Sequence, residues 1–230
     1  MPLAVITGAS RGLGAALAHA LEHSGWDLLV DGRDANALAA ATRGTAARAL
    51  AGDVTDPRHR QAVADAATAL GGVDLLVNNA STLGASPLPA VGDLTEDTLL
   101  HTLDTNLVAP HALTRLLLTQ LRKHHGTVLN ISSDAAVEGY PGWSGYGCSK
   151  AALDQISRVL AVEEPELRVY AVDPGDMWTQ MHQDAYPGED ISDRPEPTTV
   201  VPRLLGLLTS DLPSGRYRAA DLPEPLEATA

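Results

Sequence analysis

The sequence predicts an α/β fold in which a doubly wound, parallel sheet of about seven strands has helices on both faces. Two observations support this prediction. Short apolar runs alternate with longer amphipathic stretches, and the first run passes through a glycine-rich turn directly into a helix. The strands are expected at residues 3–7, 26–30, 46–51, 73–77, 127–131, 168–172 and 216–219. No internal repeat or second domain is visible, so residues 1–230 are expected to form one domain.

Composition narrows the classes of function. Apolar residues make up 44% of the chain, and no apolar run approaches the length of a membrane span. The formal charge of −13 disfavours binding to nucleic acid. The first strand begins too soon after Met1 for a signal peptide to fit, and Cys148 is the single cysteine. A cytoplasmic location is therefore expected.

The first strand leads into a glycine motif at residues 7–14, TGASRGLG, followed by a helix that ends at Gly25. In this context Gly8 allows the tight turn, Gly12 lets the backbone approach a pyrophosphate, and Gly14 lets the helix pack closely on the strand. The amino end of the helix adds unpaired N–H groups and the positive end of a dipole. The motif predicts a dinucleotide site; the alternative is a glycine-rich turn without a ligand.

The end of the second strand, at residues 31–34, is where the adenosine ribose of a dinucleotide is expected to bind. An acidic residue there accepts from the 2′-hydroxyl of NAD, whereas an arginine binds the 2′-phosphate of NADP. Both kinds are present: Asp31 favours NAD(H), and Arg33, helped by Arg11, favours NADP(H). We expect NADP(H) to be preferred and keep NAD(H) as the alternative. Arg33 and Asp34 could also form an ordinary solvated turn.

The remaining elements follow the same alternation. Asp56 is expected to cap a helix at residues 62–70, and a long helical region is expected at 95–123, with Pro110 inside it. A final helix is expected at 200–208. The segment 176–197 lacks periodicity and is long for a loop in a compact domain, so it is predicted to be a substrate loop. Residues 221–230 are expected to form a flexible tail.

Tyr146 and Lys150 stand at the start of an apolar-periodic run that predicts a helix, so they are expected one above the other on one helical face. A phenol is a poor acid–base catalyst at neutral pH because its pKa is near ~10. A nearby ammonium favours the phenolate and would bring the pKa of Tyr146 into a useful range.

Taken in order, these residues resemble the short-chain dehydrogenase/reductase family, in its short branch with a single Rossmann-fold domain. The resemblance covers nearly the whole chain, and Ser133 precedes Tyr146 by the family's interval of 13 residues. The matching positions are the glycine motif, Asp53, Asn78-Asn79-Ala80, Asn106, Ser133, Tyr146 with Lys150, and Pro174-Gly175 with Thr179. Two stretches depart from the family pattern: Ser81 replaces a glycine, and the connection at 163–167 is short.

The resemblance implies a role for each matching residue. Tyr146 would protonate the carbonyl oxygen during reduction, Lys150 would bind the nicotinamide ribose, and Ser133 would hydrogen-bond the substrate oxygen. Asn106 would hold a water that links Lys150 to solvent. The cofactor would be held by Gly8, Ser10, Arg11, Gly12, Leu13, Gly14, Arg33, Asp53, Val54, Asn79, Ala80, Tyr146, Lys150, Pro174, Gly175 and Thr179.

The predicted function is hydride transfer between NADP(H) and a carbonyl or secondary alcohol of a small, fairly apolar substrate, with no metal. The substrate pocket is expected to contain Ser133, Tyr140, Trp143, Tyr146, Met177, Trp178 and Met181, with Tyr186 a further candidate. The apolar and aromatic members could instead be loop packing. A catalytically silent dinucleotide-sensing or scaffold protein on the same fold is the alternative from another class. A sugar-nucleotide epimerase or dehydratase would need a larger substrate domain.

Two further expectations concern the region 95–123. The family resemblance implies a homodimer or homotetramer, in which the stripe Leu113, Leu116, Leu117 and Leu121 could be part of the contact face or could simply pack on the sheet. Pro110 has no N–H to donate to the Asn106 carbonyl, so the helix should bend there and that carbonyl should recruit a water. Pro110 would then help to keep a proton-relay site open; the alternative is a packing proline.

Overall fold

The computed structural model of the chain describes residues 1–223, which contain a seven-stranded, all-parallel sheet in the order β3-β2-β1-β4-β5-β6-β7. The predicted fold class is therefore confirmed. The strands are β1 (Leu3–Ile6), β2 (Asp27–Gly32), β3 (Arg48–Ala51), β4 (Leu75–Asn78), β5 (Thr127–Ile131), β6 (Arg168–Asp173) and β7 (Gly215–Arg218). Chain order reverses between β1 and β4, which is where doubly wound sheets bind ligands.

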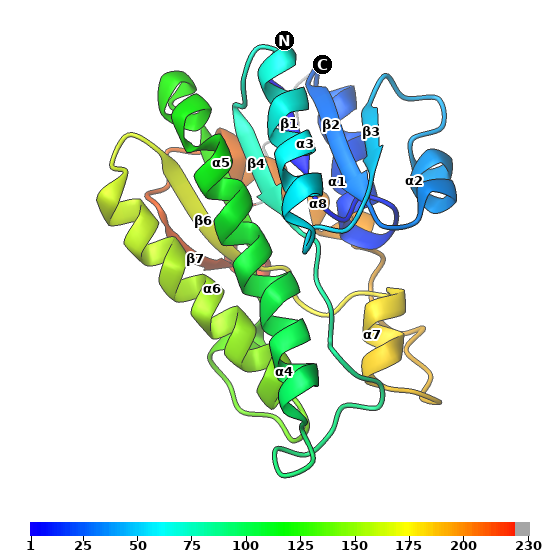
Figure 1. The fold of residues 1–230 in the computed structure, drawn as a ribbon. Coiled ribbons are helices and arrows are strands. Elements are labelled where there is room, and N and C mark those ends of the chain that lie inside the picture. Colours follow the sequence, from blue (N-terminus) through cyan, green and yellow to red (C-terminus); the bar gives the residue numbers. More distant parts are fainter. Residues whose placement is uncertain (224–230) are drawn as a thin grey trace.

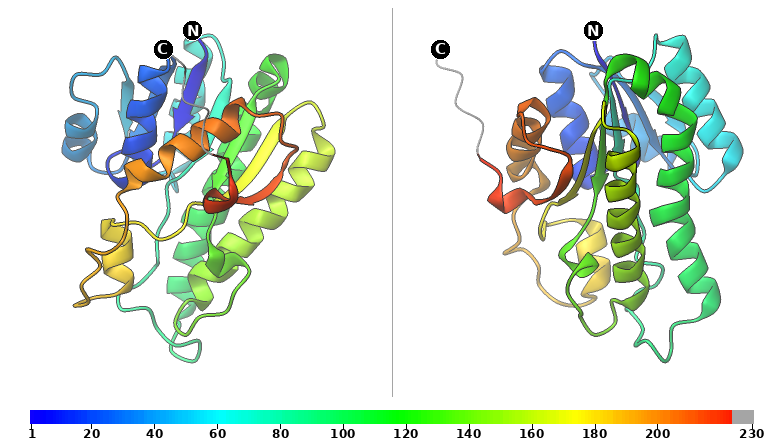
Figure 2. Two further views of the ribbon diagram at one scale, coloured as in Figure 1. Left: turned by 180° about the vertical axis from the view of Figure 1, so that it is seen from behind. Right: turned by 90° about the vertical axis from the view of Figure 1, so that its left-hand side faces the viewer.

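Helices cover both faces of this sheet (Figures 1 and 2), with α3, α5 and α6 on one side and α1 and α8 on the other. Their bounds are α1 (Gly12–His23), α2 (Ala35–Ala41), α3 (Pro57–Ala69), α4 (Glu96–Leu103), α5 (Ala109–His124), α6 (Ser144–Glu163), α7 (Gln180–Ala185) and α8 (Val201–Thr209). Because the central strands β1, β4 and β5 are buried between two helical layers, they are continuous rather than alternating runs of buried residues, whereas the edge strands β3 and β7 are partly exposed.

The apolar core is divided by the sheet into two layers. One joins α1 and α8 to the sheet, and the other joins α3 and α5 to it. Leu113, Leu117 and Leu121 are buried in the second layer, and Leu116 packs against it. The leucine stripe of α5 therefore packs mainly on the sheet, which favours the second of the two readings, while Leu116 stays partly exposed.

Three segments differ in detail from the sequence-based expectation. The region 95–123 is interrupted by a π-helical turn, Asp104–Val108, and Pro110 is the second residue of the helix that follows. The helical region is thus irregular just before Pro110, and the bend at Pro110 and the water on the Asn106 carbonyl stay predictions. The segment 176–197 contains the short helix α7. In the expected tail, Leu222 packs in the core and is 4% exposed, while residues 224–230 lie outside the described part of the chain.

Candidate active site

A cleft of about 990 Å³ opens at the carboxyl ends of the strands, where the loops after β1 to β6 meet. It brings together most of the residues expected from the sequence. Those lining it are Gly8, Ser10, Arg11, Gly12, Leu13, Arg33, Asp53, Val54, Asn79, Ala80, Ser133, Trp143, Tyr146, Lys150, Pro174, Gly175, Met177, Trp178, Thr179 and Met181. Gly14, Asn106 and Tyr140 do not line it.

The glycine motif lines the cleft and leaves no room for a side chain at Gly8 or Gly14. Gly8 has a φ of +68°, and a Cβ there would lie 2.8 Å from the Ala80 Cα. A Cβ on Gly14 would lie 2.5 Å from the Asn79 Nδ2. The Asn79 amide in turn donates to the carbonyls of Thr7 and Gly8. The turn is therefore braced from behind, and no side chain caps the amino end of α1, so its first N–H groups are open to an anion.

Arg11 and residues 31–34, where the sequence offered both arginine and aspartate side chains, have different environments in the cleft. Arg11 and Arg33 are exposed and line the cleft. Asp34 is the N-cap of α2 and accepts from two backbone N–H groups of that helix. Asp31 is 3% exposed, and both oxygens of its carboxylate have partners, Gly8 N–H and His59. Asp31, the residue that favoured NAD(H), is therefore already engaged within the protein.

Tyr146 and Lys150 lie one turn apart on α6, as expected, and both side chains are buried. The Lys150 Nζ donates to the Ile131 carbonyl at 2.8 Å and lies 5.4 Å from the centre of the Tyr146 ring. Burial lowers the pKa of Lys150 to about 8, a shift that the charge of Asp154 partly opposes.

The pKa of Tyr146 moves in the direction opposite to that expected. Burial raises it, and the hydroxyls of Ser133 and Ser81 only partly offset this increase. The expectation of a lowered pKa considered only the ammonium of Lys150. Removing the phenolate from water has the larger effect, so Tyr146 is a protonated phenol in this structure and a weaker acid than an exposed tyrosine.

Ser133 and Asn106 are held by hydrogen bonds. The Ser133 hydroxyl donates to Asp134 Oδ1 at 3.0 Å and accepts from Ala135 N–H at 3.1 Å. The Asn106 side chain, fully buried in the π-helical turn, accepts from Thr82 N–H and Ser81 Oγ and donates to Ser149 Oγ and the Thr82 carbonyl. Asn106 thus ties the loop after β4 to α6 rather than facing the cleft.

A buried charged network behind Ser133 was not predicted from the sequence. Arg216, on β7, lies 2.8 Å from Asp154 on α6 and donates at 2.8 Å to the Ser133 carbonyl. The other oxygen of Asp154 accepts from Ser132 at 2.5 Å. The partners are far apart in the sequence, so no local pattern could have indicated the network.

Of the residues expected in a substrate pocket, Trp143, Met177, Trp178 and Met181 line the cleft. The Trp143 ring packs edge-on against Tyr146 with centroids 5.5 Å apart. Two aromatic candidates lie elsewhere. The Tyr140 hydroxyl lies outside the cleft, within hydrogen-bonding distance of the carboxylates of Asp134 (3.0 Å) and Glu138 (2.9 Å), and can donate its one proton to either of them. Tyr186 packs against Trp143. Lining residues that the sequence did not indicate include Thr82, Leu83, Gly84, Ala85, Ser86, Asp134 and Thr198, while His182, Glu196 and Pro197 come from the predicted substrate loop.

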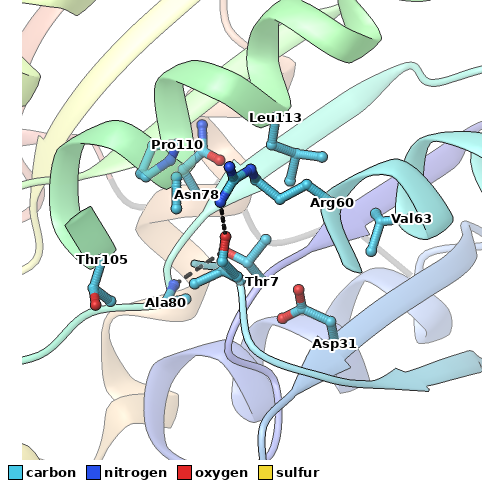
Figure 3. Close-up of a pocket in the computed structure, with 11 residues that line it drawn as sticks. Thr7, Asp31, Arg60, Val63, Asn78, Ala80, Thr105, Pro110 and Leu113 are labelled. Carbon is cyan, nitrogen blue, oxygen red and sulfur yellow. Dashed lines mark hydrogen bonds between the residues drawn. The ribbon is translucent and has the colours of Figure 1, made fainter. Parts of the chain in front are cut away.

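A second, small cavity of about 10 Å³ lies between the glycine motif and α5 (Figure 3). Arg60 enters it from α3 and donates to the Val54 carbonyl at 2.5 Å. Pro110 and Asn78 also line it, and within residues 1–223 the Asn78 Oδ1 has no hydrogen-bond partner. The hydrogen bond from Arg60 therefore supports the wall of the cleft beside Val54.

Across 1–223, no helix combines the length and apolar character that crossing a membrane requires. In the same part of the chain, no group of three or more His, Cys, Asp or Glu side chains could hold a metal ion.

Comparison with known proteins relates this geometry to a family. The family model described as short chain dehydrogenase matches residues 2–190. Serine 3-dehydrogenase of Agrobacterium fabrum is 37% identical over 177 residues, 74% of this chain and 70% of that protein. Mouse L-fucose dehydrogenase is 32% identical over 186 residues, 78% and 67% of the two chains. The crystal structure of a Shigella flexneri short chain dehydrogenase complexed with NADP has a TM-score of 0.85 at 25% identity, covering 95% of this chain and 97% of that chain.

Proposed function

This chain belongs to the short-chain dehydrogenase family of oxidoreductases, and we propose that it transfers hydride between NADP(H) and a carbonyl or secondary alcohol of a small substrate, with Tyr146 as the acid–base residue. One observation supports this most directly. Tyr146, Lys150 and Ser133 lie in the same cleft as a glycine turn shaped for a dinucleotide. The residues present fit such a cofactor, because the turn excludes side chains at Gly8 and Gly14 and leaves helix N–H groups open.

The proposed mechanism assigns a step to each of these side chains. When bound, NADP(H) supplies or accepts the hydride. Tyr146, a phenol whose pKa burial raises, gives its proton to the carbonyl oxygen during reduction and removes it in the reverse direction. Ser133 hydrogen-bonds the same oxygen as negative charge develops on it. Lys150 would hold the ribose of the cofactor and, because burial lowers its pKa to about 8, can accept and release protons near neutral pH.

The preference for NADP(H) is supported by the adenosine end of the cleft. Arg11 and Arg33 are both exposed there and could reach a 2′-phosphate. Asp31, which would favour the ribose 2′-hydroxyl of NAD(H), has both carboxylate oxygens engaged. The NADP complex of the Shigella relative agrees with this preference.

Two alternative functions would give different results for cofactor binding and turnover. A silent, dinucleotide-sensing protein on the same fold would bind the cofactor without turning over any substrate. An NAD(H)-preferring dehydrogenase would show the opposite cofactor order. The substrate is proposed to be small and fairly apolar because Trp143, Met177, Trp178 and Met181 line its end of the cleft. A homodimer or homotetramer is also proposed, without nucleic acid or membrane as partner.

The deciding experiment measures cofactor binding and turnover separately. Kd values for NADPH and NADH are measured by fluorescence titration. Oxidation and reduction are then followed at 340 nm over a panel of ketones, aldehydes, quinones and secondary alcohols that includes L-serine and L-fucose. Tyr146→Phe should lose turnover and keep its cofactor Kd, whereas Lys150→Ala should lose turnover and also bind the cofactor more weakly. Full activity of Tyr146→Phe would refute the assignment, and binding without any turnover would favour the silent protein.

A further inference from the structure

A buried pair of side chains lies directly beneath the glycine motif and has no part in the roles proposed above. Asp31 is at the end of β2, and His59 is in the first turn of α3. The His59 Nε2 lies 3.2 Å from Asp31 Oδ2, and the two side chains are 9% and 3% exposed. The other carboxylate oxygen of Asp31 accepts from Gly8 N–H at 2.8 Å, and the Asp31 carbonyl accepts from Ala9 N–H at 2.8 Å. The end of β2 therefore anchors the first two residues of the glycine turn.

The chemistry of the pair fixes the direction of each hydrogen bond. An ionised carboxylate can only accept, so the proton between Asp31 and His59 must be on the Nε2 of His59. The imidazole ring is also held in place from the other side. A Cβ on Gly52 would lie 2.1 Å from the His59 Nδ1, which shows that the ring lies against the Gly52 backbone. His59 is thus a fixed donor to one oxygen of Asp31, which leaves the other oxygen directed at Gly8.

The turn held by this carboxylate is one that needs an anchor. Gly8 adopts a φ of +68°, and glycine can reach many other conformations at little cost. Its N–H is held by Asp31 and its carbonyl accepts from the Asn79 amide at 3.1 Å. Both polar groups of the Gly8 backbone are therefore fixed before any ligand arrives. A turn fixed in its bound conformation loses less entropy on binding, so its ligand binds more tightly.

We propose that His59 is a positioning residue for dinucleotide binding, acting through Asp31 to hold Gly8 in the conformation that accepts the pyrophosphate. This inference rests on the proposed function. It also gives Asp31 a role that does not depend on the identity of the cofactor, because the pyrophosphate is common to NADP(H) and NAD(H). An Asp31 that reads the ribose would instead affect NAD(H) selectively. The two roles of Asp31 can therefore be separated by experiment.

The test compares cofactor binding across a small set of variants of the full chain. His59→Leu removes the donor at similar size, and His59→Gln keeps an amide donor. Asp31→Asn keeps an acceptor for Gly8 without the charge. His111→Leu, at an exposed position on α5, is the matched control. For each variant the Kd of NADPH and of NADH, kcat at saturating cofactor, and Tm are measured.

We expect His59→Leu to raise both Kd values by roughly tenfold, the loss expected for a hydrogen bond to a charged group. His59→Gln should restore binding to within about threefold, and the control should match the wild type. Asp31→Asn should weaken NADPH and NADH by the same factor. The kcat at saturation should be unchanged in every variant, because neither residue touches the reacting atoms.

Other results would overturn the proposal. An unchanged Kd in His59→Leu, even with a lower Tm, would mean that His59 only stabilises the fold. If His59→Leu does not fold, Asp31→Asn still decides, because a loss confined to NADH would make Asp31 a ribose reader. A wild type that binds neither nucleotide would overturn the proposed function and this inference together, whereas a wild type that binds both with an unaffected His59→Leu would overturn this inference alone.

Discussion

Replacing Arg216 tests the buried network that supports Ser133. Arg216 and Asp154 are 17% and 2% exposed and lie 2.8 Å apart, and Arg216 also donates to the Ser133 carbonyl. Arg216→Met keeps the apolar stem but leaves the Asp154 charge buried without its main partner. Breaking such a pair costs about 3–5 kcal/mol, a large part of the ~5–15 kcal/mol that stabilises a protein. For a chain of this size the cost corresponds to a fall in Tm of roughly 6–20 °C.

The assay is equilibrium unfolding in urea, with kcat measured on the folded variant. Arg218→Met, at an exposed position on the same strand, is the control and should change stability by less than about 0.5 kcal/mol. Asp154→Leu and the double variant complete a double-mutant cycle. The double variant should be more stable than the sum of the single changes predicts, by about 1–3 kcal/mol, because no charge is left unpaired. A cost below about 1 kcal/mol for Arg216→Met, with no coupling in the cycle, would refute the reasoning.

Four further predictions follow from the same structure. Burial lowers the pKa of Lys150 from 10.5 to about 8, so its charge destabilises the fold below pH 8. Because the unfolded state binds more protons than the folded state between pH 8 and 10.5, the free energy of unfolding of the wild type should rise across that window by up to ~3 kcal/mol relative to Lys150→Met. Urea unfolding at a series of pH values measures this difference, and parallel profiles for the two proteins would contradict it. Arg33→Ala should raise the Kd of NADPH by roughly tenfold to a hundredfold and leave the Kd of NADH nearly unchanged. Arg43→Ala, at an exposed position, is the control for the change in net charge. Equal losses for both cofactors would show that Arg33 does not bind the 2′-phosphate. Pro110→Ala should stabilise α5 yet slow turnover and alter its pH dependence at unchanged cofactor Kd, and a normal pH–rate profile would leave Pro110 a packing residue. Sedimentation velocity should show a dimer or tetramer that Val162→Glu, on the exposed face of α6, shifts toward monomer, whereas a wild type that sediments as a monomer at all concentrations would contradict the assembly.

Much of this protein could be predicted from the sequence, because much of its information is local. Alternating apolar runs and amphipathic stretches predict a parallel sheet with helices on both faces, and the observed strand order is one that the usual crossover rules allow. The spacing of Tyr146 and Lys150 on one helix places them one turn apart wherever that helix packs. The spacing of the glycines within eight residues likewise indicates where the backbone turns tightly and where it is approached closely.

What the tertiary structure decided depends on groups that are distant in sequence. The leucines of α5 read equally well as a contact face or a core face, and only packing on the sheet distinguished them. Asp31 reads as a ribose ligand until His59, 28 residues away, is found on its second oxygen. The pKa of Tyr146 rises rather than falls because burial, which no local pattern measures, outweighs a nearby ammonium. Sequence periodicity reports which residues share a face; charge, burial and hydrogen bonding are settled only when those faces meet.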